Sequence, residues 1–175
     1  DTLFRVASTS KAFTAASLAI LVDEGRLDWD DAVVDYIPDF ALQDDWVTQA
    51  FTVTDLLTHR SGLAPYAGDL MLWPKPNDFT RSDIIRALRH FELEIPFRTR
   101  YAYDNLLYIV AGELVPAVTG TEWQDFVDSR VMAPLGAARC FAGEIPTAEM
   151  RNIAAPHLVV EDALTVVDRN RVNAA

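Results

Sequence analysis

Residues 4–31, FRVASTSKAFTAASLAILVDEGRLDWDD, decide the architecture because they contain the clearest helical pattern of the chain. Alanine and other apolar residues fill the interior of this segment, and Gly25 follows where a left-handed cap would end a helix. The pattern predicts one helix from Ser8 to Glu24. Ser8 and Lys11 stand three residues apart at its start, which places their Cβ atoms roughly 5–6 Å apart on one face. The ammonium of Lys11 is therefore expected to reach the hydroxyl of Ser8.

A serine and a lysine placed in this way form an SxxK element, the pattern of an activated nucleophile. A hydroxyl is a poor nucleophile until a base removes its proton, and lysine acts as that base only when burial or nearby positive charge lowers its pKa. The helix N-terminus carries roughly half an elementary charge and offers free N–H groups to an oxyanion. The alternative is a serine N-cap followed by an ordinary helical lysine, and average composition predicts about one chance SxxK in such a chain.

Tyr103 and Asn105 form a second polar element, YxN, directly before another expected helix. That helix covers residues 104–118, Gly120 follows it as a stop, and Pro116 is expected to distort its last turn. Tyr101 lies nearby, but only Tyr103 has an asparagine two positions later, so Tyr101 is interpreted as an apolar ring with a polar edge. The expected helix shows its apolar residues at helical spacing, namely Leu107, Val110, Ala111, Leu114 and Val118.

Three more helix starts carry a threonine three residues before an acid or amide, the signature of a capping box. These pairs are Thr52 with Asp55, Thr80 with Asp83, and Thr121 with Gln124. His59 is interpreted as a hydrogen-bonding residue at a helix end. Residues 26–49 are expected to form a loop with little regular structure that buries Trp29, Val33, Tyr36 and Phe40.

The remaining segments are expected to be irregular or extended. Residues 62–78 combine glycine, three prolines and Trp73, which indicates an irregular loop of the kind that borders a site. Short β-branched runs predict strands at residues 158–160 and 165–167, and residues 3–6 are expected to end another strand. The visible part of the fold is therefore mainly helical.

Charge and composition exclude several classes of function. Lys and Arg number 15 against 26 Asp and Glu, and a net charge of −11 would repel nucleic acid. No run approaches the roughly 18 apolar residues of a transmembrane segment. The three histidines, His59, His90 and His157, lack metal-binding spacing, so no metal and no cofactor are expected. Adjacent aspartates at 30–31 and 44–45 point apart, which is unlike a glycosidase acid/base pair.

Taken together, the two elements resemble the SxxK and YxN motifs of serine β-lactamases, penicillin-binding DD-peptidases and related esterases, especially the class C-like branch. Residues 4–31 resemble the nucleophile helix of that family. LLTHRSGL, residues 56–63, resembles its helix-to-loop turn. YAYDNLLYIVAGELVPAVTG, residues 101–120, and APLG, residues 133–136, resemble the helix that follows its second motif. The four matches also occur in the family's order.

The resemblance implies an α+β, β-lactamase/transpeptidase-like fold, of which residues 1–175 would form a single incomplete domain covering mainly the helical lobe. It also implies a serine acyl hydrolase. Ser8 would attack a carbonyl, Lys11 and Tyr103 would transfer its proton, and Asn105 would hydrogen-bond the acyl side of the substrate. The substrate would be a β-lactam, a D-amino-acid peptide or a carboxylester. By the same resemblance, the expected location is periplasmic or secreted.

The sequence departs from the family pattern in ways that leave alternatives open. Asp104 stands where the family often has serine, Leu107 where it often has glycine, and Arg100 in a stretch that usually carries glycine. No K[ST]G or HxG element follows. The remainder of the domain, or another chain, is therefore expected to complete the sheet against the small residues Ala12, Ala15, Ala16 and Ala19. The alternative to an enzyme is a non-catalytic penicillin-binding or sensing homologue, or an inactive fragment.

Overall fold

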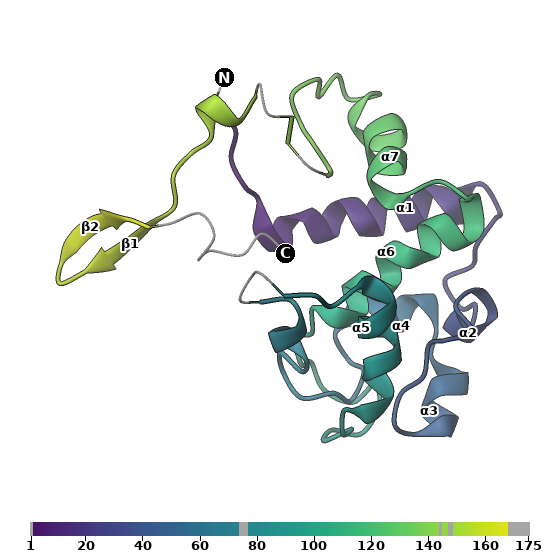
Figure 1. Ribbon diagram of the computed structural model, residues 1–175. Helices are drawn as coiled ribbons and strands as arrows, with labels where there is room; N and C mark the ends of the chain where they lie inside the picture. Colours follow the sequence, from purple (N-terminus) through teal and green to yellow (C-terminus); the bar gives the residue numbers. More distant parts are fainter. Residues whose placement is uncertain (1, 74–76, 144, 147–148, 168–175) are drawn as a thin grey trace.

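A computed structural model describes residues 2–73, 77–143, 145–146 and 149–167 of the chain. These residues form a helical body and a two-stranded hairpin that projects from it (Figure 1). In the helical body, α6 (Leu106–Thr119) contacts α1 (Lys11–Asp23) and α7 (Trp123–Val127), and it also contacts α4 (Val53–Thr58) and α5 (Arg81–Ala87). The predicted helical lobe is confirmed, with α6 at its centre.

The nucleophile helix begins with a tighter turn than the sequence predicts. Residues Ala7–Ser10 form a 3₁₀ turn, and the α-helical hydrogen bonding of α1 begins at Lys11. Its C-terminal end is the predicted one, because Gly25 adopts a φ of 66°. The Gly25 N–H donates to Val22 O and the Arg26 N–H donates to Leu21 O, which together form a Schellman cap. A 3₁₀ turn therefore precedes the first residue of α1, and a Schellman cap at Gly25 ends the helix.

Helix α6 buries the face that its sequence pattern predicts. The predicted core positions Leu107, Val110, Ala111 and Leu114 are fully buried. The helix continues through Pro116 to Thr119, and Gly120 ends it in the left-handed conformation with a φ of 72°. Because Asn105 directly precedes α6, the packing of this buried helix determines where the YxN element lies.

Two of the three predicted capping boxes are present, at the starts of α4 and α5. The third is wrong, because α7 begins at Trp123 with Glu122 as its N-cap. The physical reason is the turn after Gly120, where the Thr121 N–H donates to the Thr119 hydroxyl. The backbone N–H of Thr121 is therefore bonded within this turn, and the helix starts two residues later, at Trp123.

The prediction of little regular structure in residues 26–49 is wrong in part. Two short helices, α2 (Val33–Tyr36) and α3 (Asp45–Ala50), lie in this stretch. The missed signal for α3 is Asp44, whose carboxylate accepts the Val47 N–H as an N-cap at 2.9 Å. The four predicted core residues do pack inward, with Val33 and Phe40 fully buried and Trp29 and Tyr36 half-buried.

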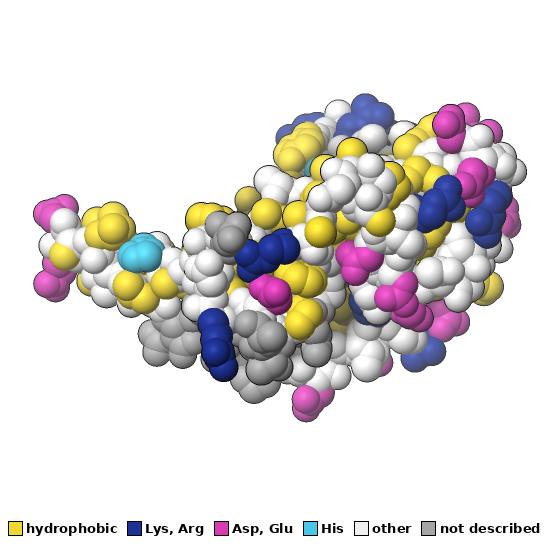
Figure 2. Space-filling view, turned by 90° about the horizontal axis from the view of Figure 1, so that it is seen from above, with side chains coloured by type: hydrophobic (Ala, Val, Ile, Leu, Met, Phe, Trp, Pro, Cys, Tyr) yellow, Lys and Arg dark blue, Asp and Glu magenta, His cyan; other side chains and the backbone are white. Residues whose placement is uncertain are grey.

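The two predicted strands near the end are confirmed as β1 (His157–Val160) and β2 (Ala163–Val166), an antiparallel pair. Both are exposed along their length, and Figure 2 shows hydrophobic side chains gathered on the projecting arm. The strand predicted for residues 3–6 is wrong, because only Leu3 pairs, through one parallel bridge to Ile153. On the α1 face expected to meet the sheet, Ala12 and Ala19 are exposed, whereas Ala15 and Ala16 are partly buried. No helix of the described chain is long and apolar enough to span a bilayer.

An ion pair between a buried carboxylate and an exposed arginine connects the start of α4 to the segment before the YxN element. The Asp55 side chain is 3% exposed and accepts hydrogen bonds from Arg98 Nε at 2.9 Å and Arg98 Nη2 at 2.6 Å. Burial alone would raise the pKa of Asp55, but hydrogen bonds from Arg98 and Thr52 hold it below its ordinary value. At neutral pH the Asp55 carboxylate is therefore ionised, and the hydrogen bonds from Arg98 and Thr52 stabilise its charge.

Arg98→Ala should lower the free energy of unfolding by about 1–2 kcal/mol, because the Asp55 carboxylate loses its cationic partner while Arg98 is itself partly exposed. Arg86→Ala is the matched control, since the Arg86–Asp39 pair lies in solvent, and its effect should stay within about 0.5 kcal/mol. Urea denaturation of both variants measures the difference. Equal effects would show that burial of Asp55 does not matter to this contact.

Candidate active site

The fold brings together all four residues singled out in the sequence. The 3₁₀ turn and the first turn of α1 supply Ser8 and Lys11, and the segment entering α6 supplies Tyr103 and Asn105. Lys11 Nζ lies 3.1 Å from Ser8 Oγ, and the Tyr103 hydroxyl donates to the same oxygen at 2.7 Å. Lys11 Nζ also donates to Asn105 Oδ1 at 2.7 Å. Ser8 itself is exposed, so its hydroxyl is open to a ligand while two proton-carrying groups contact it.

Aromatic rings surround the Lys11 ammonium. Its nitrogen lies 5.0 Å from the centre of the Tyr103 ring and 5.3 Å from that of Tyr108, distances at which a ring face attracts a cation. No carboxylate of the described residues forms an ion pair with Lys11, so neutral groups hold it beside Ser8.

His59 fixes the segment that carries Tyr103. Its carbonyl accepts the Ala102 N–H at 2.8 Å, and its Nδ1 accepts the Asp104 N–H at 3.2 Å. The two bonds bracket Tyr103, whose ring centre lies 4.5 Å from that of His59. Burial and the charge of Lys11 lower the pKa of His59, in keeping with a neutral ring whose Nδ1 accepts. The predicted helix-end role is confirmed, because His59 ends α4 with a φ of 55°.

Tyr101 contributes differently from Tyr103. Its side chain is 67% exposed, and its ring meets the His59 ring edge-on with centres 5.4 Å apart. Of the two tyrosines, Tyr103 is the one whose hydroxyl is found to contact Ser8, in the register that the YxN spacing indicates.

Asp69 is a site residue that the sequence did not single out. It begins a short 3₁₀ turn, Asp69–Met71, and its two carboxylate oxygens lie 3.2 and 3.0 Å from Asn105 Nδ2. The preceding Gly68 has a φ of 75°, and a Cβ there would lie 2.3 Å from a methyl carbon of Leu106, so both its backbone conformation and its surroundings favour glycine. Burial raises the pKa of Asp69, and its bond from Asn105 and the charge of Lys11 act against that rise. The only signal in the sequence was the irregular loop in which Asp69 lies.

Asp104 lies between Tyr103 and Asn105 and is fully buried. Its Oδ1 accepts the Leu107 N–H at 3.1 Å in the first turn of α6, whereas its Oδ2 has no hydrogen-bond partner. Burial is the main cause that raises the pKa of Asp104 to about 7, and the charge of Asp69 adds to it. The carboxyl is therefore mainly protonated in mildly acidic solution.

Asp104→Asn should flatten the dependence of stability on pH. Between pH 3.8 and about 7 the folded chain keeps a proton on Asp104 that the unfolded chain releases, so stability falls as pH rises through this window. The loss amounts to at most about 4 kcal/mol, at roughly 1.4 kcal/mol per pH unit. Urea denaturation of both proteins at about pH 4.5 and about pH 7.5 measures the difference. If the wild-type protein and Asp104→Asn lost the same free energy of unfolding between these two pH values, the prediction would be wrong.

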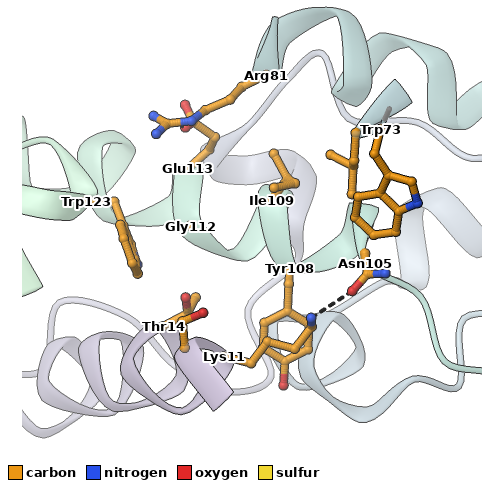
Figure 3. A pocket seen from close by; sticks show the side chains of 12 residues that line it. Lys11, Thr14, Trp73, Arg81, Asn105, Tyr108, Ile109, Gly112, Glu113 and Trp123 are labelled. Carbon is orange, nitrogen blue, oxygen red and sulfur yellow. Dashed lines mark hydrogen bonds and ion pairs between the residues drawn. The ribbon is translucent and has the colours of Figure 1, made fainter. Parts of the chain in front are cut away.

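A cavity of about 440 Å³ opens beside Lys11 and Asn105, between α1 and α6. Figure 3 shows Trp73 and Trp123 at its opposite ends, with Arg81 and Glu113 at one edge. Its volume lies in the range of small-molecule sites, and aromatic and aliphatic side chains form much of its wall. Among the described residues, no three His, Cys, Asp or Glu side chains gather as metal ligands.

The fold is β-lactamase/transpeptidase-like, since a solved structure of a penicillin-binding protein homologue from Caulobacter crescentus has a TM-score of 0.69 and 30% identity over 88% of this chain and 40% of that one. The profile of the family described as Beta-lactamase matches residues 1–175. The chain therefore belongs to the beta-lactamase family.

Similar proteins include hydrolases and penicillin-binding proteins. Unguisins hydrolase ungD' of Aspergillus campestris is 37% identical over 145 residues, which cover 78% of this chain and 26% of that protein. Penicillin-binding protein 4 of Amycolatopsis lactamdurans is 33% identical over 78% of this chain and 35% of its own length. A solved structure of D-amino acid amidase from Ochrobactrum anthropi has a TM-score of 0.77 and 28% identity over 98% of this chain and 48% of that one. The chain thus spans less than half the length of each of these relatives.

Proposed function

We propose that this protein is a serine hydrolase that forms an acyl-enzyme at Ser8 and acts on an amide or ester. The observation that carries the proposal is the double contact on Ser8 Oγ, from Lys11 Nζ at 3.1 Å and the Tyr103 hydroxyl at 2.7 Å. A hydroxyl needs a base within hydrogen-bond reach to act as a nucleophile, and here two candidate groups meet that condition.

In the proposed reaction, Ser8 Oγ bonds to the carbonyl carbon while its proton passes to the Lys11–Tyr103 pair. The same pair then returns the proton to the leaving nitrogen or oxygen as the bond to it breaks. Water then attacks the resulting ester, one of its protons returns to Ser8 Oγ through the same pair, and the acyl group leaves as a carboxylic acid. The Ser8 N–H, at the start of the 3₁₀ turn, is one oxyanion donor. Asn105 holds Lys11 in place and borders the acyl side.

The relatives support hydrolysis as the type of reaction, since unguisins hydrolase and D-amino acid amidase are named for it. Within that type, the candidate substrates are a β-lactam, a D-amino-acid peptide and a carboxylester. Because penicillin-binding proteins are among the relatives, we also propose a periplasmic or secreted location. The remainder of the domain, or a second chain, would supply a second oxyanion donor, whose absence costs about 10²–10³-fold in serine hydrolases.

Intact-mass measurement after incubation with a fluorophosphonate, and separately with benzylpenicillin, tests the proposal on the protein expressed from its complete reading frame. A single adduct with turnover of nitrophenyl esters or nitroanilides is expected. Adduct formation without turnover would instead favour the penicillin-binding or sensing homologue. The absence of an adduct with either reagent would contradict acylation altogether.

A further inference from the structure

Next to Lys11 and Asn105 the site holds a carboxylate, that of Asp69, and no free amide donor at Asn105. Both polar atoms of the Asn105 side chain already have partners, because Oδ1 accepts from Lys11 and Nδ2 donates to Asp69. Asn105 is 5% exposed, so its amide has little room to turn. The group to which the Asn105 amide donates is the Asp69 carboxylate, which is half-buried and keeps lone pairs that Asn105 does not use.

Within the described part of the chain, no Lys, Arg or His side chain forms an ion pair with the Asp69 carboxylate. Among the described residues its carboxylate accepts hydrogen bonds from Asn105 alone, and Lys11 acts on it through its charge without a hydrogen bond to it. A half-buried carboxylate without a cationic partner is costly, and a ligand that brings a positive charge removes the cost. The net charge of −11 also favours the approach of a cation over that of an anion.

The geometry points to a substrate that carries a protonated amine next to the scissile carbonyl, with Asp69 as the residue that selects it. This inference rests on the proposed acylation of Ser8. An ammonium on the acyl side would donate to Asp69, whereas an N-acylated substrate would bring a carbonyl oxygen toward the same carboxylate. The adjacent cavity, with Trp73, Ile109 and Trp123 in its wall, would take an apolar side chain of that substrate.

The test compares alanine p-nitroanilide with N-acetylalanine p-nitroanilide, each as the D and the L form, near pH 6.5, where an α-amine of ordinary pKa of about 7.7–8 is protonated. In the wild-type protein the free amine should be preferred in kcat/KM by about tenfold or more, the size of one charge-assisted hydrogen bond. Asp69→Asn keeps an oxygen for Asn105 but loses the charge. This variant should reduce the preference to within about threefold, mainly through a higher KM for the free amine.

Glu113→Gln is the matched control, because Glu113 is another carboxylate of the cavity wall but is already paired with Arg81 at 3.0 Å. The preference for the free amine should survive in this variant. If labelling occurs without turnover, competition of alanine amide and N-acetylalanine amide against fluorophosphonate labelling measures the same ratio.

Two results would overturn the inference. One is a wild-type protein that prefers the N-acetyl substrate or treats both alike. The other is an Asp69→Asn variant that loses activity equally on both substrates, since Asp69 would then only orient Asn105. Failure of the underlying acylation gives a different result, namely no fluorophosphonate adduct on the wild-type protein.

Discussion

Ser8→Ala is expected to abolish the covalent adduct with a fluorophosphonate, because the variant lacks the oxygen that both Lys11 and Tyr103 contact. Loss of a nucleophile is complete for acylation, unlike loss of a group that assists it. Intact-mass measurement over the time course that saturates the wild-type protein checks this result.

Ser10→Ala is the control for that experiment. Ser10 lies in the same 3₁₀ turn, and its hydroxyl donates to the Ala7 carbonyl. This variant should still be labelled. Undiminished labelling of Ser8→Ala would place the nucleophile elsewhere.

Lys11→Ala and Tyr103→Phe should each slow acylation by about 10²–10⁴-fold, the range for a positioned acid or base. Each variant removes one of the two groups within hydrogen-bond distance of Ser8 Oγ. The rate constant of labelling, measured under pseudo-first-order conditions, gives the loss for each. Because the two groups share one proton path, the double variant should lose less than the product of the single losses.

Tyr101→Phe is the matched control for Tyr103→Phe, since it removes the same hydroxyl from a ring only two residues away. Its effect should be small, because Tyr101 is largely exposed and its ring contacts His59. A larger loss for Tyr101→Phe than for Tyr103→Phe would mean that the register of the YxN element is wrong.

The parts of the site that follow from local geometry were predictable from the sequence. Residues three apart on a helical turn must stack, so Ser8 and Lys11 meet, although a 3₁₀ turn replaces the expected α-helical one. The capping boxes of α4 and α5 have both partners within four residues and therefore form as predicted. The apolar spacing of α6 likewise fixes its buried face and, with it, the position of Asn105.

Contacts between distant segments were not predictable in this way. Asp69 and Asn105 are 36 residues apart in sequence, and their contact depends on a loop whose path is set by Gly68 fitting against Leu106 and Phe91. Asp104 was visible only as a departure from the family pattern. Its full burial follows from the packing around α6, and the sequence around it carries no mark of that packing.

The most direct test of the central claim is to locate the adduct by tandem mass spectrometry of the digested, fluorophosphonate-labelled protein. The proposed mechanism predicts that the added mass lies on Ser8, within the peptide that also holds Thr9 and Ser10. Fragment ions on either side of Ser8 distinguish the three hydroxyls. An adduct on Thr9, on Ser10 or on a residue outside this turn would contradict the assignment of Ser8 as the nucleophile.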